Sequence, residues 1–564
     1  MDQLNNILEQ ISGFVWGVPM VSILLLTGVV LTLRMVFIQI RGFAHGVAIA
    51  SGKYDDPAHE GELTHFQALS AALSATIGIG NIAGVAIAIY YGGPGAIFWM
   101  WVSAFFGMAI KYTECTLAIQ YREVEPDGNI LGGPMYYIKL GMKKYFLPLA
   151  YLFAFCTAIA AFGSGNMAQS NTLAHSVVSA FKVEPDHKIA IHQIQTESAR
   201  EAIKRFNVAF GEAQVDGGER FAIYHDSLSN IRFTADTAPL GSKTYYVEGT
   251  MPAGVGSDGE LYRLGIGNEL LNEQSLTVIQ KGPVAIWRWI IGIVLASLVA
   301  TVIIGGIRRI GHVASVLTPF MSVVYVLSAL IILVIKAEDI LPAFQLIFHH
   351  AFNPTAVVGG SATGATVWMT ISWGLRRGLF SNEAGQGSAA MAHSTARVKE
   401  PVREGLVAML GPFIDTILIC TMTALVIIST GVWDSGLNGA ELTMTAFDKA
   451  LPIYGEWMVV VGIVLFAFST VIAWSYYGEK GIEFLAGKKA KLPYKWVFVL
   501  FTLLGARLDL EAVWSYADTA NGLMAVPNLV ALIGLSGAVV GITRKYMREK
   551  REGIHIPFKQ RSKQ

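Results

Sequence analysis

The feature that most constrains this chain is an apolar segment whose centre is unfavourable to a continuous helix. The segment 66–91 has about the length that spans a bilayer. Its central run 75–84, ATIGIGNIAG, places glycines and polar side chains at membrane depth. Irregular backbone persists there only where protein or a water-filled cavity satisfies its N–H and C=O groups. The run therefore indicates either a solute and ion site or close helix–helix packing through small residues.

Composition places this segment in a membrane protein. Of the 564 residues only 15% are charged, and the mean hydropathy is +0.49. Several apolar runs approach 20 residues, so we expect a polytopic, all-α membrane protein. The net charge of +1 gives no electrostatic case for a nucleic-acid partner.

The hydropathy pattern predicts eleven spans, and the basic residues between them set their orientation. Six clusters of Lys and Arg fall on one side if the count is eleven, which predicts an N-terminus outside and a C-terminus in the cytoplasm. The expected spans are 14–35, 66–91, 95–120, 146–180, 284–305, 312–336, 357–392, 402–430, 456–478, 494–510 and 520–542.

A polar block at 181–282 interrupts the apolar pattern. Its charge density excludes it from lipid, and the orientation places it outside the cell. A capping box and apolar periodicity predict a helix at 198–210, and the segments 244–247 and 261–264 look strand-like. We expect a small extracytoplasmic α+β insertion whose partner the sequence leaves unknown.

A second interruption lies in the seventh span. The stretch 355–393 has 39 residues, about 58 Å as one helix against a hydrocarbon core of about 30 Å. Its middle, 370–387, contains four glycines and three charged residues. Either the charges mark a functional site in the membrane, or they pair with one another near the cytoplasmic interface.

The two interruptions divide the chain into inverted halves. Spans two to six and seven to eleven form groups of opposite topology, and each group begins with an interrupted span, which is the best sequence indicator of a transporter's midplane site. The expected parts are a peripheral helix at 1–45, a first half at 60–180 and 283–336, the insertion at 181–282, a second half at 355–543 and a basic cytoplasmic tail at 544–564.

Long motifs at both interruptions carry a resemblance to a known family. They are ALSATIGIGNIAG at 72–84, RGLFSNEAG at 377–385, PFIDT with CTMTA within 412–424, and FST with WSYYGE within 468–479. The chain resembles the alanine or glycine:cation symporter family, sodium-coupled amino-acid carriers of bacterial and archaeal plasma (inner) membranes. The resemblance implies a LeuT-like five-plus-five inverted repeat with one extra N-terminal helix. The block 181–282 departs from the compact family pattern.

The resemblance also implies that spans two, four, seven and nine surround the amino acid. A zwitterion needs donors for its carboxylate and acceptors for its ammonium, and the interrupted second span offers both. Gln169 is either a substrate ligand or an interhelical hydrogen-bond partner, and Trp474 is placed to cap the side-chain pocket. The expected substrate residues are Thr76, Gly78, Gly80, Asn81, Gln169, Trp373, Ser381, Asn382, Thr470 and Trp474.

The sodium site implied by the resemblance lies between spans two and nine. Sodium is a hard cation and prefers several oxygen ligands, in the manner of other hard cations. The carbonyls near Thr76 and Ile79 and the hydroxyls of Ser469 and Thr470 would supply them. Alternatively, the two hydroxyls bond back to the preceding helical turn. Thr470 is assigned to both sites.

Three further charged residues stand inside apolar spans. Asp415 is either a proton or cation ligand or a hydrogen-bonded structural group. Lys111 and Glu114 stand three residues apart on one expected helix, so we expect them to pair with each other in a structural role.

The sequence thus predicts a symporter that imports a small neutral amino acid, alanine or also glycine, together with sodium by alternating access. Its expected partners are the amino acid, the sodium ion and the lipid bilayer. No HExxH or GxSxG motif occurs, so no enzyme is expected, and no cofactor beyond the co-transported ion is implied. The alternatives are a proton-coupled carrier using Asp415 and a membrane sensor that detects its ligand through 181–282.

Overall fold

The computed structural model describes residues 16–181, 186–194, 213–216, 220–225, 228–237, 243–250, 276–281, 283–353, 367–508, 510–554 and 557. These residues belong to two compact units. The first comprises Met1–Leu173, Val294–Leu508 and Ala512–Gln564, and the second comprises Ala174–Ile293 with Asp509–Glu511.

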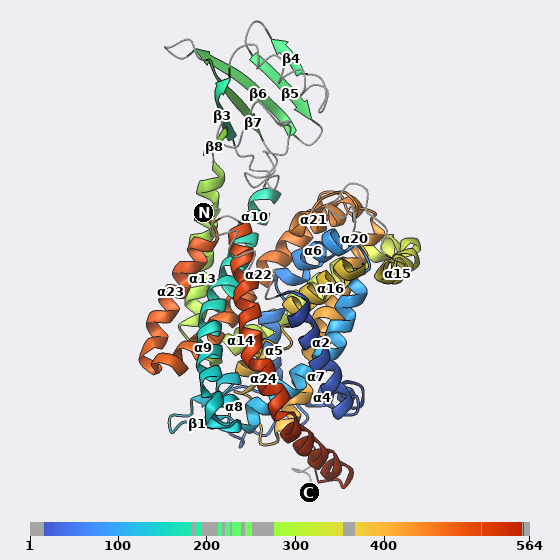
Figure 1. The fold of residues 1–564 in the computed structure, drawn as a ribbon, viewed down its shortest axis with the longest axis vertical. Coiled ribbons are helices and arrows are strands. Elements are labelled where there is room, and N and C mark those ends of the chain that lie inside the picture. The colour runs from blue at the N-terminus through green and yellow to red at the C-terminus, as the bar shows by residue number, and fades with distance from the viewer. Residues whose placement is uncertain are drawn as a thin grey trace. The chain divides into compact units, whose positions relative to one another are not determined.

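Helices dominate the first unit (Figure 1). From its N-terminal part come α2 Val18–Arg34, α3 Ile38–Arg41, α4 Phe43–Ala50, α5 His65–Thr76, η1 Ile79–Asn81, α6 Ala83–Gly92, α7 Ala96–Gln120, α8 Pro134–Gly141, η2 Lys144–Phe146, α9 Leu147–Phe162, the π-helix η3 Gly163–Met167 and α10 Ala168–Ala180, which continues into the second unit. A short hairpin pairs β1 Glu123–Val124 with β2 Ile130–Leu131.

The remainder of the helical unit begins with α13 Pro283–Ile303, which enters from the second unit. It continues with α14 Gly306–Ile335, α15 Ala337–Phe352, α16 Val367–Asn382, α17 Ser388–His393, α18 Pro401–Ala408, α19 Leu410–Pro412, the π-helix η5 Phe413–Cys420, α20 Thr421–Ser429, α21 Gly439–Ala450, α22 Tyr454–Ala486, η6 Lys488–Ala490, α23 Lys491–Gly505 and α24 Leu510–Arg551.

The predicted polytopic, mostly helical character is confirmed. Each expected span contains helix in its described part, and the second span is broken between α5 and α6 with a bend of 61°. Among the described residues, seven helices are long and apolar enough to cross a membrane, or eight if the bent pair counts as one span. The seventh span is also broken, because α16 ends at Asn382 and α17 begins at Ser388. Both expected interruptions are therefore real breaks.

The helix boundaries differ from the hydropathy boundaries at several places. α22 runs to Ala486 rather than 478, and α24 runs to Arg551 rather than ending at 542. The first eight residues of the expected basic tail are thus helical. Hydropathy reports the thickness of the bilayer, whereas a helix rich in Lys and Arg can continue into water. α15 and α21 are additional helices in connections where no helix was expected.

The second unit contains the sheet of the predicted insertion. Six antiparallel strands follow the order β4-β5-β6-β7-β3-β8. Their bounds are β3 Asp186–Ile194, β4 Ala213–Asp216, β5 Arg220–His225, β6 Leu228–Thr237, β7 Lys243–Thr250 and β8 Leu276–Lys281. The expected strand 244–247 lies in β7, where Tyr246 pairs with Thr234 on one side and Ala190 on the other. The expected helix 198–210 and strand 261–264 lie outside the described residues.

Packing in the helical unit brings the two breaks together. α7 lies against both α16 and α17, and α22 lies against both α5 and α9. Beyond the breaks, Leu63 and Ala396 form a parallel bridge that joins the segment before α5 to the segment after α17. Arg122 reinforces this junction by donating hydrogen bonds to the carbonyls of Ser394, Ala396 and Val398 at 2.6–2.9 Å. The segments flanking the two breaks are therefore tied to each other.

Candidate functional site

At the first break, two backbone N–H groups donate to side-chain amide oxygens instead of to the helix. Between α5 and α6, the Gly78 N–H donates to Asn81 Oδ1 at 2.9 Å, and the Ile79 N–H donates to Gln169 Oε1 at 3.2 Å. The side chains of Asn81 and Gln169 are 0% and 3% exposed. Both N–H groups lack the helical acceptor four residues earlier because the chain bends there. Neutral amide oxygens satisfy them instead.

Close approach of other elements requires glycine at position 78. A Cβ there would lie 2.6 Å from Thr470 Oγ1 and 3.1 Å from Gln169 Oε1. Both distances are shorter than ordinary contact, so any side chain would displace one of these groups. Gly78 thus marks the point where α22, α10 and the first break converge. At Gly80 a Cβ would meet the Phe380 ring at 3.4 Å, so Gly80 packs against α16.

Asp415 joins the two broken helices. Asn81 Nδ2 donates to Asp415 Oδ1 at 2.6 Å, and Ser381 Oγ donates to Asp415 Oδ2 at 2.7 Å. Thr416 Oγ1 donates to the same Oδ2 at 2.7 Å, and Asp415 is fully buried. The residue lies in the π-helix η5, an irregularity frequent at functional sites. The structure thus shows Asp415 accepting hydrogen bonds from both broken helices.

The second break is built from left-handed backbone. Glu383, Gly385 and Gly387 have φ values of 54°, 89° and 78°. The Gly385 and Gly387 N–H groups donate to Glu114 Oε1 at 3.0 and 3.2 Å, and Asn528 Nδ2 donates to the same oxygen at 2.7 Å. A buried carboxylate on α7 therefore caps the second break.

This role of Glu114 corrects the expected pairing with Lys111. No ion pair joins the two residues, and within the described part of the chain the Lys111 Nζ has no hydrogen-bond partner although it is buried. The pairing rule considers only neighbours on one helix, whereas Glu114 points to a segment about 270 residues away in the sequence. Sequence spacing carries no signal for that contact.

Trp474 and Glu383 link α22 to the second break. The Trp474 Nε1 donates to Glu383 Oε1 at 2.9 Å, and Trp474 is 2% exposed. A Cβ at Gly165 would lie 2.3 Å from the Trp474 Cβ, so the glycine in η3 permits close packing of this indole. Trp474 thus packs between η3 and the second break.

The expected sodium ligands surround the end of α5. Thr470 Oγ1 donates to the carbonyls of Ser74 and Ile77 at 3.1 and 3.3 Å. Ser469 Oγ donates to the Phe466 carbonyl at 2.9 Å and to the Ser74 carbonyl at 3.3 Å. Both the crossing to α5 and the bond back to the preceding turn are therefore present. The hydroxyls and carbonyls form an oxygen-rich region at the bend.

The remaining expected residues divide between the site and its periphery. Asn382 Nδ2 donates to Thr416 Oγ1 at 3.2 Å, next to Asp415, whereas Thr76 Oγ1 donates to the Leu73 carbonyl at 3.3 Å within its own helix. Trp373 is only half-buried and stacks on Tyr91 with ring centroids 4.3 Å apart. That contact joins the ends of α16 and α6, about 12 Å along the helix from Ser381. Trp373 does not lie with the other expected ligands.

The family comparison matches nearly the whole chain. The sequence model of the sodium:alanine symporter family matches residues 1–196 and 261–560. The unmatched residues 197–260 fall inside the predicted insertion. Its ends, 181–196 and 261–282, lie within the matched ranges, so only the central part of the insertion falls outside the family model.

Individual relatives are carriers. A "sodium/alanine symporter AgcS" from Methanococcus maripaludis is 39% identical over 96% of this chain and 97% of its own. A "putative sodium/proton-dependent alanine carrier protein" from Bacillus subtilis is 29% identical over 98% and 94%, and a "probable sodium/glutamine symporter" from the same organism is 28% identical over 98% and 93%. The crystal structure of MhsT with L-phenylalanine covers 86% of this chain and 99% of its own at 12% identity and a TM-score of 0.46.

Proposed function

The chain belongs to the sodium:alanine symporter family, and on that premise we propose that it imports a small neutral amino acid, alanine or also glycine, together with sodium. The observation that carries the proposal is the pair of N–H groups at Gly78 and Ile79, which are held by neutral amide oxygens in a buried break. A substrate carboxylate can replace those oxygens as a stronger, charged acceptor. A substrate carboxylate bound here would therefore exchange places with these two amide oxygens.

The surrounding charges favour a neutral substrate. Asp415 accepts hydrogen bonds from both broken helices, and Glu383 accepts one from Trp474. The ammonium of the amino acid finds an acceptor in this region, whereas an acidic side chain would face two carboxylates. The buried Trp474 indole favours a short side chain.

Sodium would bind at the bend of α5. The carbonyls near Thr76 and Ile79 and the hydroxyls of Ser469 and Thr470 supply oxygen ligands from two elements. An ion held between α5 and α22 fixes the break in the conformation that receives the carboxylate, because both sites share the same backbone turn. If this turn binds sodium with different affinity in the outward-facing and inward-facing states, the sodium flux and the amino-acid flux are coupled.

Orientation and location complete the proposal. We place the protein in the plasma (inner) membrane of a bacterium or archaeon with its N-terminus outside and its C-terminus in the cytoplasm, as the basic clusters predict. The sheet-bearing insertion then lies outside the cell.

Uptake into proteoliposomes tests the function. The purified full chain is reconstituted, and accumulation of radiolabelled alanine is measured with an inward sodium gradient and with potassium in its place. Accumulation that requires sodium is the expected result, and competition by unlabelled glycine, D-alanine and glutamine then maps the pocket. Accumulation under an acid-outside gradient without sodium would move the coupling to protons. Absence of uptake for every small neutral amino acid would refute the substrate assignment.

A further inference from the structure

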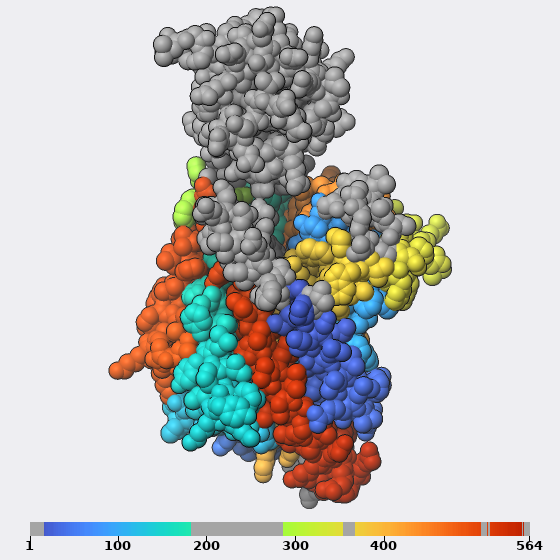
Figure 2. Space-filling model, viewed as in Figure 1, coloured from blue at the N-terminus to red at the C-terminus, as the bar shows by residue number. Residues whose placement is uncertain are grey.

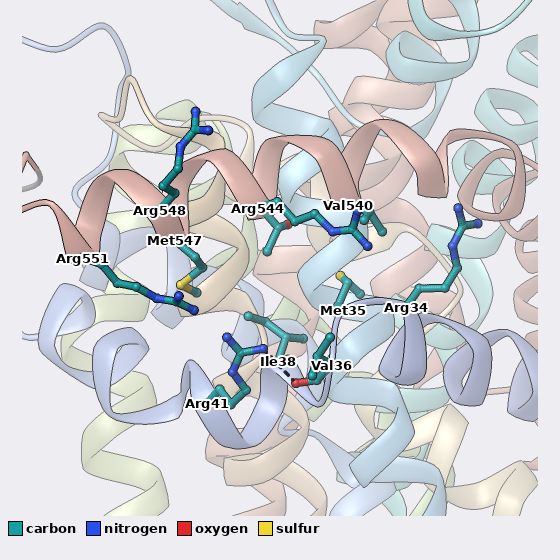
Figure 3. Close-up of a pocket in the computed structure, with 11 residues that line it drawn as sticks. Arg34, Met35, Val36, Ile38, Arg41, Val540, Arg544, Met547, Arg548 and Arg551 are labelled. Atoms are coloured by element: carbon teal, nitrogen blue, oxygen red, sulfur yellow. Dashed lines mark hydrogen bonds between the residues drawn. The ribbon is translucent and has the colours of Figure 1, made fainter.

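A pocket remote from the two breaks contains five arginines. It lies between the turn that joins α2 to α3 and the last turns of α24, and its cavity has a volume of about 140 Å³. Arg34 and Arg41 come from one wall, and Arg544, Arg548 and Arg551 come from the other (Figure 3). Figure 2 shows the C-terminal helix in red against the N-terminal helices in blue on this face.

The positive charge of this pocket has no counter-charge in the described part of the protein. No acidic residue lines it. The guanidinium groups of Arg544, Arg548 and Arg551 make no hydrogen bond or ion pair with any described residue. Arg34 donates to Ser536 Oγ at 2.6 Å, and Arg41 donates weakly to the Val36 carbonyl at 3.4 Å. In Figure 3 the Arg548 guanidinium points away from the α2–α3 turn, whereas Arg41, Arg544 and Arg551 lie on the side of α24 that faces it. Like charges gathered there repel one another unless an anion lies among them.

The pocket lies where apolar surface gives way to charge. Leu33, Phe37 and Ile40 beside it are 59%, 42% and 64% exposed. Such side chains are typical of a lipid-facing surface, and the arginines begin where α2 and the apolar part of α24 end. We therefore expect the pocket to lie at the level of the lipid headgroups.

The turn that forms the first wall has unusual backbone. Val36 and Phe37 both have positive φ, 55° and 54°, a conformation that β-branched and bulky residues rarely adopt. The turn directs α3 back toward α24, so that Met35, Val36 and Ile38 form apolar lining beside the guanidinium groups. Strained backbone of this kind persists where the surrounding structure or a bound group holds it.

We propose that this pocket binds the phosphate headgroup of an anionic phospholipid. Arginine forks match the geometry of phosphate oxygens, and basic pockets between membrane helices are suited to acidic headgroups. The apolar lining distinguishes a lipid from free phosphate, because only a lipid brings glycerol and acyl carbon to cover it. The bound lipid would hold α2 and α3, which precede both halves of the carrier, against its last helix.

Lipid retention in native mass spectrometry tests the assignment. The full chain, purified in detergent, is incubated with equal amounts of phosphatidylglycerol and phosphatidylcholine, and the lipid retained is measured. Arg41→Gln with Arg544→Gln removes one charge from each wall. Lys143→Gln with Lys144→Gln removes two exposed positive charges from another basic cluster and serves as the matched control.

We expect the parent and the lysine variant to retain phosphatidylglycerol at least about fivefold over phosphatidylcholine, and the arginine variant to lose that preference. Equal retention of the two lipids by the parent, or equal loss in both double variants, overturns the proposal. Displacement of the lipid by millimolar inorganic phosphate would assign the pocket to free phosphate instead. If the arginine variant elutes as aggregate, Arg41→Lys with Arg544→Lys keeps the charge and should show weakened but selective retention. None of these readouts depends on transport.

Discussion

The two breaks of this carrier satisfy their freed backbone groups in opposite ways. At the first, the N–H groups of Gly78 and Ile79 donate to the neutral amides of Asn81 and Gln169. At the second, the N–H groups of Gly385 and Gly387 donate to the carboxylate of Glu114. Hydrogen bonds to a charged acceptor are roughly twice as strong as those between neutral groups. The first break is thus held by neutral amide acceptors and the second by a carboxylate.

This difference is the basis for our proposal that the first break binds substrate and the second is structural. Both breaks have glycine and a polar side chain, and both meet at Asp415 through Asn81 and Ser381. They differ in the acceptor and in the backbone, which is left-handed at Glu383, Gly385 and Gly387 but extended at Gly78. We infer that the first break exchanges ligands during transport while the second supplies a fixed frame.

Removal of the carboxylate cap should have the largest effect. Glu114→Ala leaves three buried donors, the N–H groups of Gly385 and Gly387 and the amide of Asn528, without their acceptor. We expect the free energy of unfolding to fall by about 3–5 kcal/mol, the scale for breaking a buried charged network, measured by thermal unfolding in detergent. Glu114→Gln, which keeps an oxygen acceptor, should lose less. An unfolding midpoint equal to that of the parent would show that the second break needs no charged cap.

Asp415→Asn should abolish transport while the protein still folds. The substitution preserves the shape of the side chain but removes the charge that accepts hydrogen bonds from Asn81, Ser381 and Thr416. The hydroxyls of Ser381 and Thr416 can rotate to accept hydrogen bonds from the new amide. We expect sodium-driven alanine uptake to fall about 100-fold, equivalent to about 2.7 kcal/mol, with an unfolding midpoint near that of the parent. Asp434→Asn, at an exposed position, is the control. Retained uptake would mean that Asp415 is not part of the coupling.

The sequence was sufficient to locate both breaks. Glycines and polar residues inside an apolar run, and a run too long for one membrane crossing, are local properties of 75–84 and 355–393. The length of a helix and the thickness of the bilayer then limit where each span can be interrupted. α15 and α21 were missed because both lie in connections, outside the apolar runs from which the spans were predicted.

The partners within the site were harder to predict than its location. Three separate elements bring together Asn81, Ser381 and Asp415. The sequence motifs identify each residue but do not predict that the three are in contact. Glu114 was paired with its helical neighbour, and Trp373 was placed with the ligands although it stacks on Tyr91. Which face of a helix meets which neighbour depends on tertiary packing, for which one sequence carries no periodic signal.

Gly78→Ala tests how tightly the first break is packed. The new methyl would lie 2.6 Å from Thr470 Oγ1, so the Thr470 side chain must move away from it. We expect the KM for alanine to rise about tenfold, equivalent to about 1.4 kcal/mol, with little change in stability because Thr470 can change rotamer. Gly84→Ala is the matched control, since a Cβ there meets nothing within 4 Å. Equal KM values for both variants would show that close packing against Gly78 does not affect alanine binding.

Gln169→Leu should give the smallest and most informative effect. Loss of the amide leaves the Ile79 N–H without its acceptor, which costs about 1 kcal/mol in the ligand-free protein. If a substrate carboxylate takes over that N–H, alanine with sodium restores the loss, and the ligand-induced rise in unfolding temperature should be larger in the variant than in the parent. Asn171→Leu removes hydrogen bonds to the carbonyls of Gly505 and Leu508, away from the break, so ligand should not restore its stability. If alanine rescues neither variant, Gln169 is a permanent cap like Glu114, and the two breaks differ in charge but not in function.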